Sequence, residues 1–95
     1  MSRIPFIYQN REIGYMDFDM SVGSGDMYST AGYSTRWIGR VVYDSDGNSF
    51  HATNSRTGRM ATFRVEDNTL IFNKSYHGDR ISQDEFCVYL GFFDD

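Results

Sequence analysis

The sequence has few of the residues that favour helices. Its 95 residues include only 2 Leu, 3 Ala and 1 Lys, which are among the strongest helix formers. By contrast, 8 Phe, 7 Tyr, 1 Trp, 6 Ile, 5 Val and 6 Thr make up about a third of the chain, and these residues favour strands. The composition therefore excludes a helical bundle. Aromatic residues at 17% and apolar residues at 40% also argue against disorder, because they can supply a core.

Cysteine is nearly absent as well. The only one is Cys87, so no intrachain disulfide can form, whereas small secreted domains usually carry several. No run approaches 18 apolar residues, and no apolar segment typical of a signal peptide follows the first residues. We therefore expect a reducing, cytoplasmic setting and no contact with a membrane.

Positive charge is scarce. The chain has 9 basic and 13 acidic residues, for a net charge of −4. Proteins that bind nucleic acid through its phosphates are usually basic, so this balance argues against direct nucleic-acid binding. All but one of the basic residues are arginine, the residue suited to planar, bidentate recognition.

The strand-forming residues occur in short runs separated by turn residues. Polar turns at 9–12, 44–48 and 66–68 each join two such runs, and Asp46-Gly47 is a strong hairpin signal. We predict a single all-β domain over residues 1–95, either a small antiparallel barrel or a radially repeated sheet built from hairpins. Its open edges would allow a homodimer. The predicted strands are 4–8, 13–20, 37–43, 49–53, 59–65 and 69–72.

Residues 21–35 differ from the rest of the chain because nine of the fifteen are Ser, Thr or Gly. This composition predicts a loop. A loop of that length is unusual in a compact domain, so it is either functional or partly ordered.

The C-terminal segment admits two structures. Ser82-Gln83-Asp84-Glu85 fits a capping box, which would begin a short helix through residues 86–90. The same run is aromatic and β-branched, which favours a strand. We favour the strand and keep the short helix as the alternative.

One pattern recurs in the sequence: apolar, small, any, apolar, any, apolar, acidic. Residues 13–19, 38–44 and 60–66 match it, and a partial copy begins at Leu90. Segments 10–16, 42–48 and 58–63 resemble units of small bacterial proteins with a four-fold β-flower repeat, in which hairpins carrying Tyr-Asp-x-x-Gly-Asn and Val-Gly-apolar motifs radiate from a centre. The resemblance implies repeated hairpins and no particular activity.

Metal and cofactor motifs are weak. The segment 44–48 begins like a calcium loop, but Ser49 and Ser55 stand where the EF-hand needs Gly and Glu, so we predict a hairpin turn. Asp17 and Asp19 could hold Mg²⁺, yet no glycine-rich phosphate loop accompanies them. We predict no metal and no cofactor.

Catalytic candidates are equally few. Cys87 lies in the apolar run 86–88, where a free cysteine behaves as a small hydrophobe. His51 has the setting of a half-exposed strand residue. His77, beside Gly78 and Asp79, is the better acid–base candidate.

Tyrosine, tryptophan and arginine mark the best binding candidates. Tyr and Ser/Gly mixtures characterise binding loops, and Trp, Tyr and Arg dominate interface hot spots. The alternative is that the loop tyrosines fold back onto the core. The predicted binding residues are Tyr28, Tyr33, Arg36 and Trp37 in or beside the loop, and Arg56 and Arg59 near the turn at 57–58.

Three functions follow, in order of preference. The first is a non-catalytic module that binds another protein, such as an inhibitor, an immunity protein or a bacterial or phage accessory factor. The second is a small enzyme or ligand-binding domain that uses His77, Asp79 and Arg80 with Asp17 and Asp19. The third is an acidic decoy for a nucleic-acid-binding protein, which would capture its partner in a salt-sensitive way.

Overall fold

The computed structural model describes residues 2–75 and 78–94. Within this part of the chain, eight strands and one helix form. The elements are β1 (Ser2–Tyr8), β2 (Arg11–Asp19), β3 (Ser24–Ser29), β4 (Arg36–Asp44), β5 (Ser49–Asn54), β6 (Met60–Glu66), β7 (Thr69–Asn73), β8 (Arg80–Ile81) and α1 (Gln83–Tyr89). The predicted all-β fold, built from antiparallel hairpins, is confirmed.

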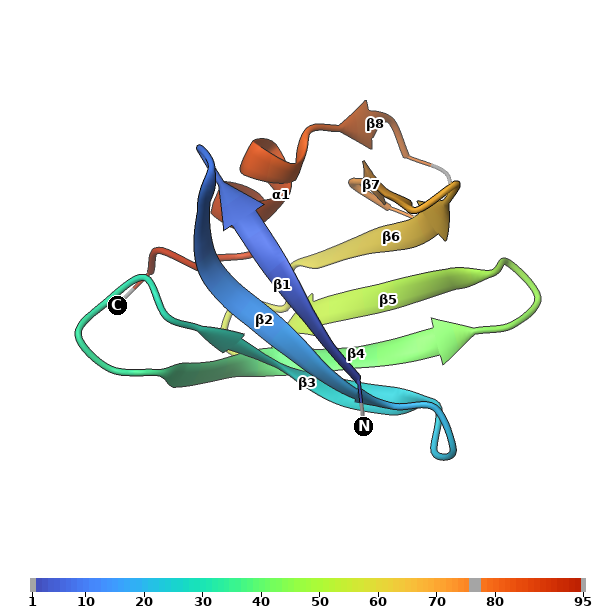
Figure 1. Cartoon of the computed structure of the whole chain (residues 1–95), viewed down its shortest axis with the longest axis horizontal. Helices are drawn as coiled ribbons and strands as arrows, with labels where there is room; N and C mark the ends of the chain where they lie inside the picture. The colour runs from blue at the N-terminus through green and yellow to red at the C-terminus, as the bar shows by residue number, and fades with distance from the viewer. Residues whose placement is uncertain (1, 76–77, 95) are drawn as a thin grey trace.

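The strands form one sheet in the order of the sequence, β1 to β8, and each pairs antiparallel with the next. The sheet curls into a half-barrel, with α1 above its concave side (Figure 1). The turns suit this topology. Gln9-Asn10 and Asp67-Asn68 are two-residue hairpin loops in which both residues have positive φ, as a type I′ turn requires.

Helix α1 spans the opening between the two ends of the sheet, because it packs against both β1 and β7. Its side chains also accept hydrogen bonds from β1 and from the turn that follows it. The Ile7 amide donates to Gln83 Oε1 at 2.7 Å, and the Gln9 amide donates to Asp84 Oδ1 at 3.1 Å. The helix therefore covers part of the edge that a half-barrel would otherwise leave open.

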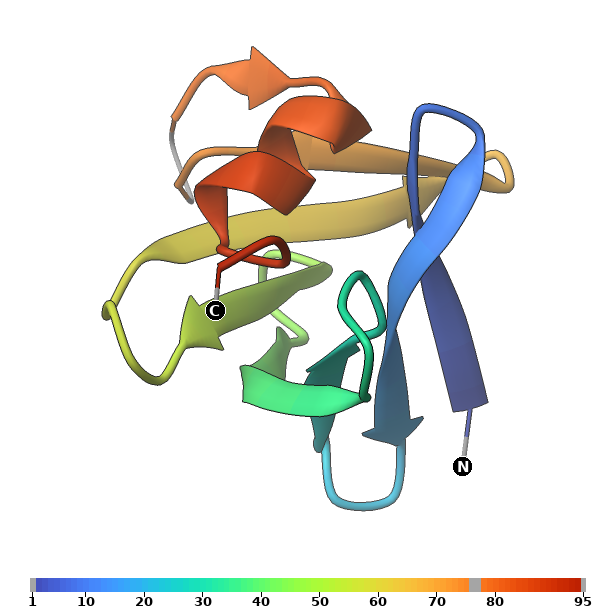
Figure 2. The same ribbon diagram turned by 90° about the vertical axis from the view of Figure 1, so that its left-hand side faces the viewer.

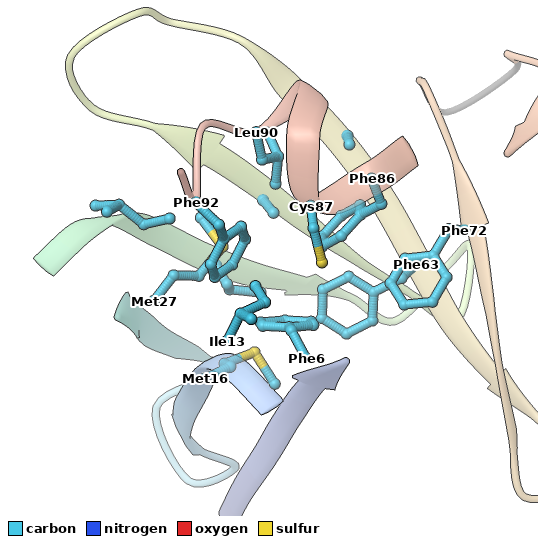
Figure 3. Close-up of a cluster of buried hydrophobic side chains, with 14 of the residues drawn as sticks. Phe6, Ile13, Met16, Met27, Phe63, Phe72, Phe86, Cys87, Leu90 and Phe92 are labelled. Carbon is cyan, nitrogen blue, oxygen red and sulfur yellow. The ribbon is translucent and has the colours of Figure 1, made fainter. Parts of the chain in front are cut away.

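Phenylalanine dominates the core (Figure 3). Phe6 is fully buried, and its ring centroid lies 5.6 Å from that of Phe63, 5.3 Å from Phe86 and 5.2 Å from Phe92. These four rings come from β1, β6, α1 and the segment after α1. The core thus joins the two ends of the half-barrel through aromatic edge and face contacts.

The predicted loop at 21–35 is wrong in its extent, because strand β3 runs through its centre. Gly25, Met27 and Ser29 alternate inward along β3 and are buried. Gly25 is required there, since a Cβ would lie 2.2 Å from the backbone oxygen of Asp17 on β2. Small residues in this stretch therefore allow close strand packing. Outside β3, the predicted loop is a turn at residues 21–23 and an irregular connection at residues 30–35.

The preference for a C-terminal strand is also wrong, because residues 83–89 form a helix. The Ser82 hydroxyl accepts from the Glu85 amide at 3.0 Å, as the capping box predicts. At the other end, the Phe92 amide bonds to Cys87 O and the Gly91 amide to Val88 O, with Gly91 at φ 82°. This is a Schellman motif. The caps and the burial of Phe86 and Cys87 outweigh the β-propensity of the run.

We expect Ser82→Ala to lower the free energy of unfolding by about 1 kcal/mol, because the Glu85 amide loses its capping partner. Urea denaturation followed by circular dichroism measures the change. Ser34→Ala is the matched control, since Ser34 is exposed between β3 and β4. Equal losses in the two variants would show that the cap does not hold the helix.

Three copies of the sequence repeat lie in alternate strands of the sheet, and each copy ends at the last residue of its strand. Residues 13–19, 38–44 and 60–66 lie in β2, β4 and β6, the first strands of the hairpins β2–β3, β4–β5 and β6–β7. The partial copy at Leu90 is not a strand, because Leu90 caps α1. The resemblance to β-flower proteins stays a prediction.

Candidate functional site

Three aromatic side chains cross the outer face of the sheet. Tyr15, Tyr28 and Trp37 lie on β2, β3 and β4, and they are paired in register, Tyr15 with Tyr28 and Tyr28 with Trp37. The two tyrosine rings stack, with centroids 5.2 Å apart and planes at 29°. Trp37 keeps 48% of its surface exposed. We call these three residues the aromatic row.

Polar contacts fix both ends of the aromatic row. At one end, the Arg3 guanidinium lies 4.0 Å from the Tyr15 ring centroid and pairs with Asp17 at 3.0 Å. This hydrogen bond raises the pKa of Arg3 above its usual value. At the other end, Trp37 Nε1 donates to Asp26 Oδ1 at 2.9 Å. The rings are therefore held in place by contacts within the chain.

A small pocket adjoins Trp37, where the start of β4, the end of β5 and the C-terminal segment meet. We call it the C-terminal pocket. Its volume is about 100 Å³, and it is lined by Arg36, Trp37, Ile38, Asn54, Ser55, Arg56, Gly91 and Asp94. Figure 2 shows the C-terminal segment beside the end of β5, below the helix.

Buried hydrogen bonds build the pocket. Asn54 is 3% exposed, and its amide nitrogen donates to Leu90 O at 2.7 Å, while its Oδ1 accepts from the amides of Arg56 and Thr57. Ser29 Oγ donates to Phe92 O. The residues after α1 are thus tied to both β3 and β5. Because Asn54, Leu90, Ser29 and Phe92 are all buried, the bonds from Asn54 and Ser29 to the C-terminal segment make the pocket a defined part of the structure.

Two arginines supply the charge of the pocket. Arg56 Nη2 pairs with Asp94 Oδ2 at 2.9 Å. Arg36 is half-buried, and its Nη2 donates to the backbone oxygen of Phe92 at 3.4 Å. Among the residues that the structure describes, no carboxylate lies within ion-pair distance of Arg36. The pocket therefore carries one arginine with no acidic partner.

The pocket is too small for a metabolite or an organic cofactor. Sites for such ligands usually occupy about 300–1,000 Å³, against about 100 Å³ here. A volume of this size suits one side chain or a small ion.

The structure brings together four of the six predicted binding residues. Arg36, Trp37 and Arg56 share the C-terminal pocket, and Tyr28 is next to Trp37 through strand pairing. Tyr33 is fully exposed in the connection before β4. Neither tyrosine folds back onto the core, because Tyr28 stacks on Tyr15 at the outer face.

Arg59 lies apart from the pocket. Its Nη1 donates to Tyr89 O at 3.3 Å, and its guanidinium carbon lies 5.2 Å from the Tyr89 ring centroid. It thus places a positive charge at the C-terminal end of α1, where the helix dipole makes such a charge favourable. The structure gives Arg59 a contact with the helix rather than with the pocket.

The predicted catalytic groups do not form a cluster. Asp17 pairs with Arg3, and Asp19 accepts from the hydroxyl and amide of Ser21, which lowers the pKa of Asp19. Arg80 is on β8, which five strands separate from β2 in the sheet order. His77 lies outside the described residues. Within residues 2–75 and 78–94, no three His, Cys, Asp or Glu side chains are placed to hold a metal.

Cys87 is a buried core residue, as its apolar neighbours predict. Burial raises the pKa of its thiol to about 12, with a further contribution from the charge of Asp84. The thiol is therefore neutral near pH 7, and its Sγ lies 3.8 Å from Ile7 O. A neutral, buried thiol is a poor nucleophile.

Sequence reasoning missed Tyr15, Asp26 and Asp94. The alternation in residues 13–19 contains the signal for Tyr15, since Gly14, Met16 and Phe18 occupy the opposite, buried face. The small residues around Asp26 predict a loop, although Asp26 lies in β3. No local pattern places Asp94 beside Arg56, because the contact joins residues 38 positions apart.

No protein-family model, curated protein or solved structure matches the chain. In the described residues, no helix has both the length and the apolar character needed to cross a bilayer. The geometry of the aromatic row and the pocket is therefore the basis for assigning a function.

Proposed function

We propose that the chain is a non-catalytic module that binds another protein through the aromatic row and the C-terminal pocket. One observation carries the proposal: Trp37 belongs to both features and is 48% exposed. Exposed tryptophan beside tyrosine and arginine is the composition of interface hot spots. As in the sequence-based expectation, the module would act as an inhibitor, immunity protein or bacterial or phage accessory factor in the cytoplasm.

The side chains of the aromatic row are already fixed in conformation, and this supports a binding role. Loose side chains lose conformational entropy on association, at about 0.5–1.5 kcal/mol for each flexible side chain that becomes fixed. Here the Tyr15–Tyr28 stack, the Arg3–Asp17 pair and the Trp37–Asp26 bond already fix the side chains. A partner would therefore meet a rigid surface, and less of the contact energy would be lost.

The test is capture of a partner from the host, its identification by mass spectrometry, and measurement of Kd with the purified partner. We expect Trp37→Ala to weaken binding by about 30-fold or more, since a hot-spot residue contributes about 2 kcal/mol. Val88→Ala is the control. Val88 is 55% exposed on α1, away from the row, so its removal should leave Kd nearly unchanged.

Three outcomes would contradict the proposal. The first is an unchanged Kd for Trp37→Ala in a protein that still folds. The second is a dimer in light scattering that Trp37→Ala dissociates, which would make the surface a self-association site. The third is capture of the partner that disappears at high salt and does not depend on Trp37, as the acidic-decoy hypothesis requires.

A further inference from the structure

The two arginines of the C-terminal pocket have more hydrogen-bond donors than their neighbours satisfy. A guanidinium carries five N–H donors, yet Arg36 makes one 3.4 Å contact with Phe92 O. Asp94, paired with Arg56, is the acidic side chain that lines this pocket. The pocket is therefore locally positive although the chain carries a net charge of −4.

The Asp94 side chain is held only weakly in the C-terminal pocket by its ion pair with Arg56. Its side chain is 46% exposed and that of Arg56 is 62% exposed. Exposed ion pairs contribute about 0.2–1 kcal/mol, so an incoming carboxylate can replace Asp94 without breaking a strong contact. The backbone of this segment is held independently, by the Asp94 amide to Gly91 O and by the bonds to Phe92 O.

The shape of the pocket selects a short acidic side chain. Its volume of about 100 Å³ excludes a large ligand. A carboxylate matches the planar donors of arginine. Ile38 and Trp37 provide apolar contact for methylene groups, and the Ser55 hydroxyl is one further polar group in the lining.

We propose that the C-terminal pocket takes an aspartate or glutamate side chain of the protein partner, which displaces Asp94 from Arg56 and pairs with Arg36 and Arg56. The proposal deepens the proposed function and depends on it, because the acidic side chain is supplied by the bound protein. The partner would thus present an acidic residue beside the contact that it makes with Trp37.

The single tryptophan of the chain makes the test direct. Because Trp37 lines the pocket, its indole N–H resonance in the ¹⁵N-labelled full chain reports occupancy. The probes are N-acetylglutamate amide, the isosteric N-acetylglutamine amide, and inorganic phosphate. We expect the glutamate probe to shift the resonance in a saturable way, and the glutamine probe to bind at least several-fold more weakly.

Two opposite variants sharpen the test. Arg36→Gln should weaken binding of the glutamate probe about 5-fold. Asp94→Asn should tighten its binding about 1.5- to 5-fold, because the competing carboxylate is removed. Arg11→Gln changes the net charge as Arg36→Gln does, at an exposed site at the start of β2, and should have little effect. If Arg36→Gln does not fold, Arg36→Lys replaces it in the test, because lysine keeps the positive charge but lacks the planar guanidinium.

The proposal is overturned if the glutamine probe binds as tightly as the glutamate probe, if Asp94→Asn does not tighten binding, or if phosphate binds more tightly than glutamate. These failures are distinct from failure of the proposed function. Partner capture that still depends on Trp37, together with no glutamate binding, would reject only the acidic-side-chain assignment.

Discussion

Phe6→Ala is expected to lower the free energy of unfolding by about 3–5 kcal/mol, the range for removal of a buried phenylalanine ring. The Phe6 ring touches Phe63, Phe86 and Phe92 (Figure 3). Its loss leaves a cavity where β1, β6 and α1 meet. Because a small domain has about 5–15 kcal/mol of stability, the change removes a large part of it.

Urea denaturation followed by Trp37 fluorescence and circular dichroism measures the effect. Phe93→Ala is the matched control, since Phe93 is 41% exposed and its ring contacts Tyr8 at 4.7 Å; we expect a loss of about 1 kcal/mol. If Phe6→Ala does not fold, Phe6→Leu should fold with a smaller loss. Equal losses for Phe6→Ala and Phe93→Ala would show that the aromatic cluster does not join the ends of the half-barrel.

Most of the hairpins could be predicted because their signals are local. Asn10, Asn48, Asp67 and Asn68 have positive φ in turns, which asparagine and aspartate tolerate. These turns lie between runs of aromatic and β-branched residues. Where turn chemistry and strand propensity agree, six strands follow from the sequence.

The wrong predictions lie where tertiary packing, and not the local sequence, determines the secondary structure. In β3, Gly25 and Ser29 look like loop residues, but they are small because β2 and Phe92 approach them closely. At the C-terminus, the strand propensity of residues 86–90 was outweighed by the Ser82 cap and by burial against the concave side of the sheet.

The candidate site was partly predictable for the same reason. Arg36, Trp37 and Arg56 come together because β4 and β5 form one hairpin, whose register pairs Gly39 with Asn54. That hairpin follows from the Asp46-Gly47 turn signal. Asp94 joins the pocket only through the folding of α1 back over the sheet, a long-range contact that no local pattern contains.

Gly39→Ala is expected to have the second large effect on stability, and it also tests how the pocket depends on the packing of β4 against β5. A Cβ at Gly39 would lie 1.9 Å from Thr53 O and 2.9 Å from Thr53 C, both in the backbone of β5. Backbone atoms cannot rotate away as a flexible side chain can, so β4 and β5 must separate. We expect a loss of about 3 kcal/mol, at the upper end of the usual range for overpacking.

Gly32→Ala is the control, because a Cβ there meets nothing within 4 Å. Its unfolding free energy should stay within about 0.5 kcal/mol of the original protein. Gly39→Ala should also weaken binding of the glutamate probe. Separation of β4 from β5 would move Ile38 and Asn54, and both of these residues line the pocket. Gly32→Ala should leave the probe unaffected. If Gly39→Ala is as stable as Gly32→Ala and binds the probe equally well, then β4 and β5 are not packed at the described register, and the pocket does not depend on their contact.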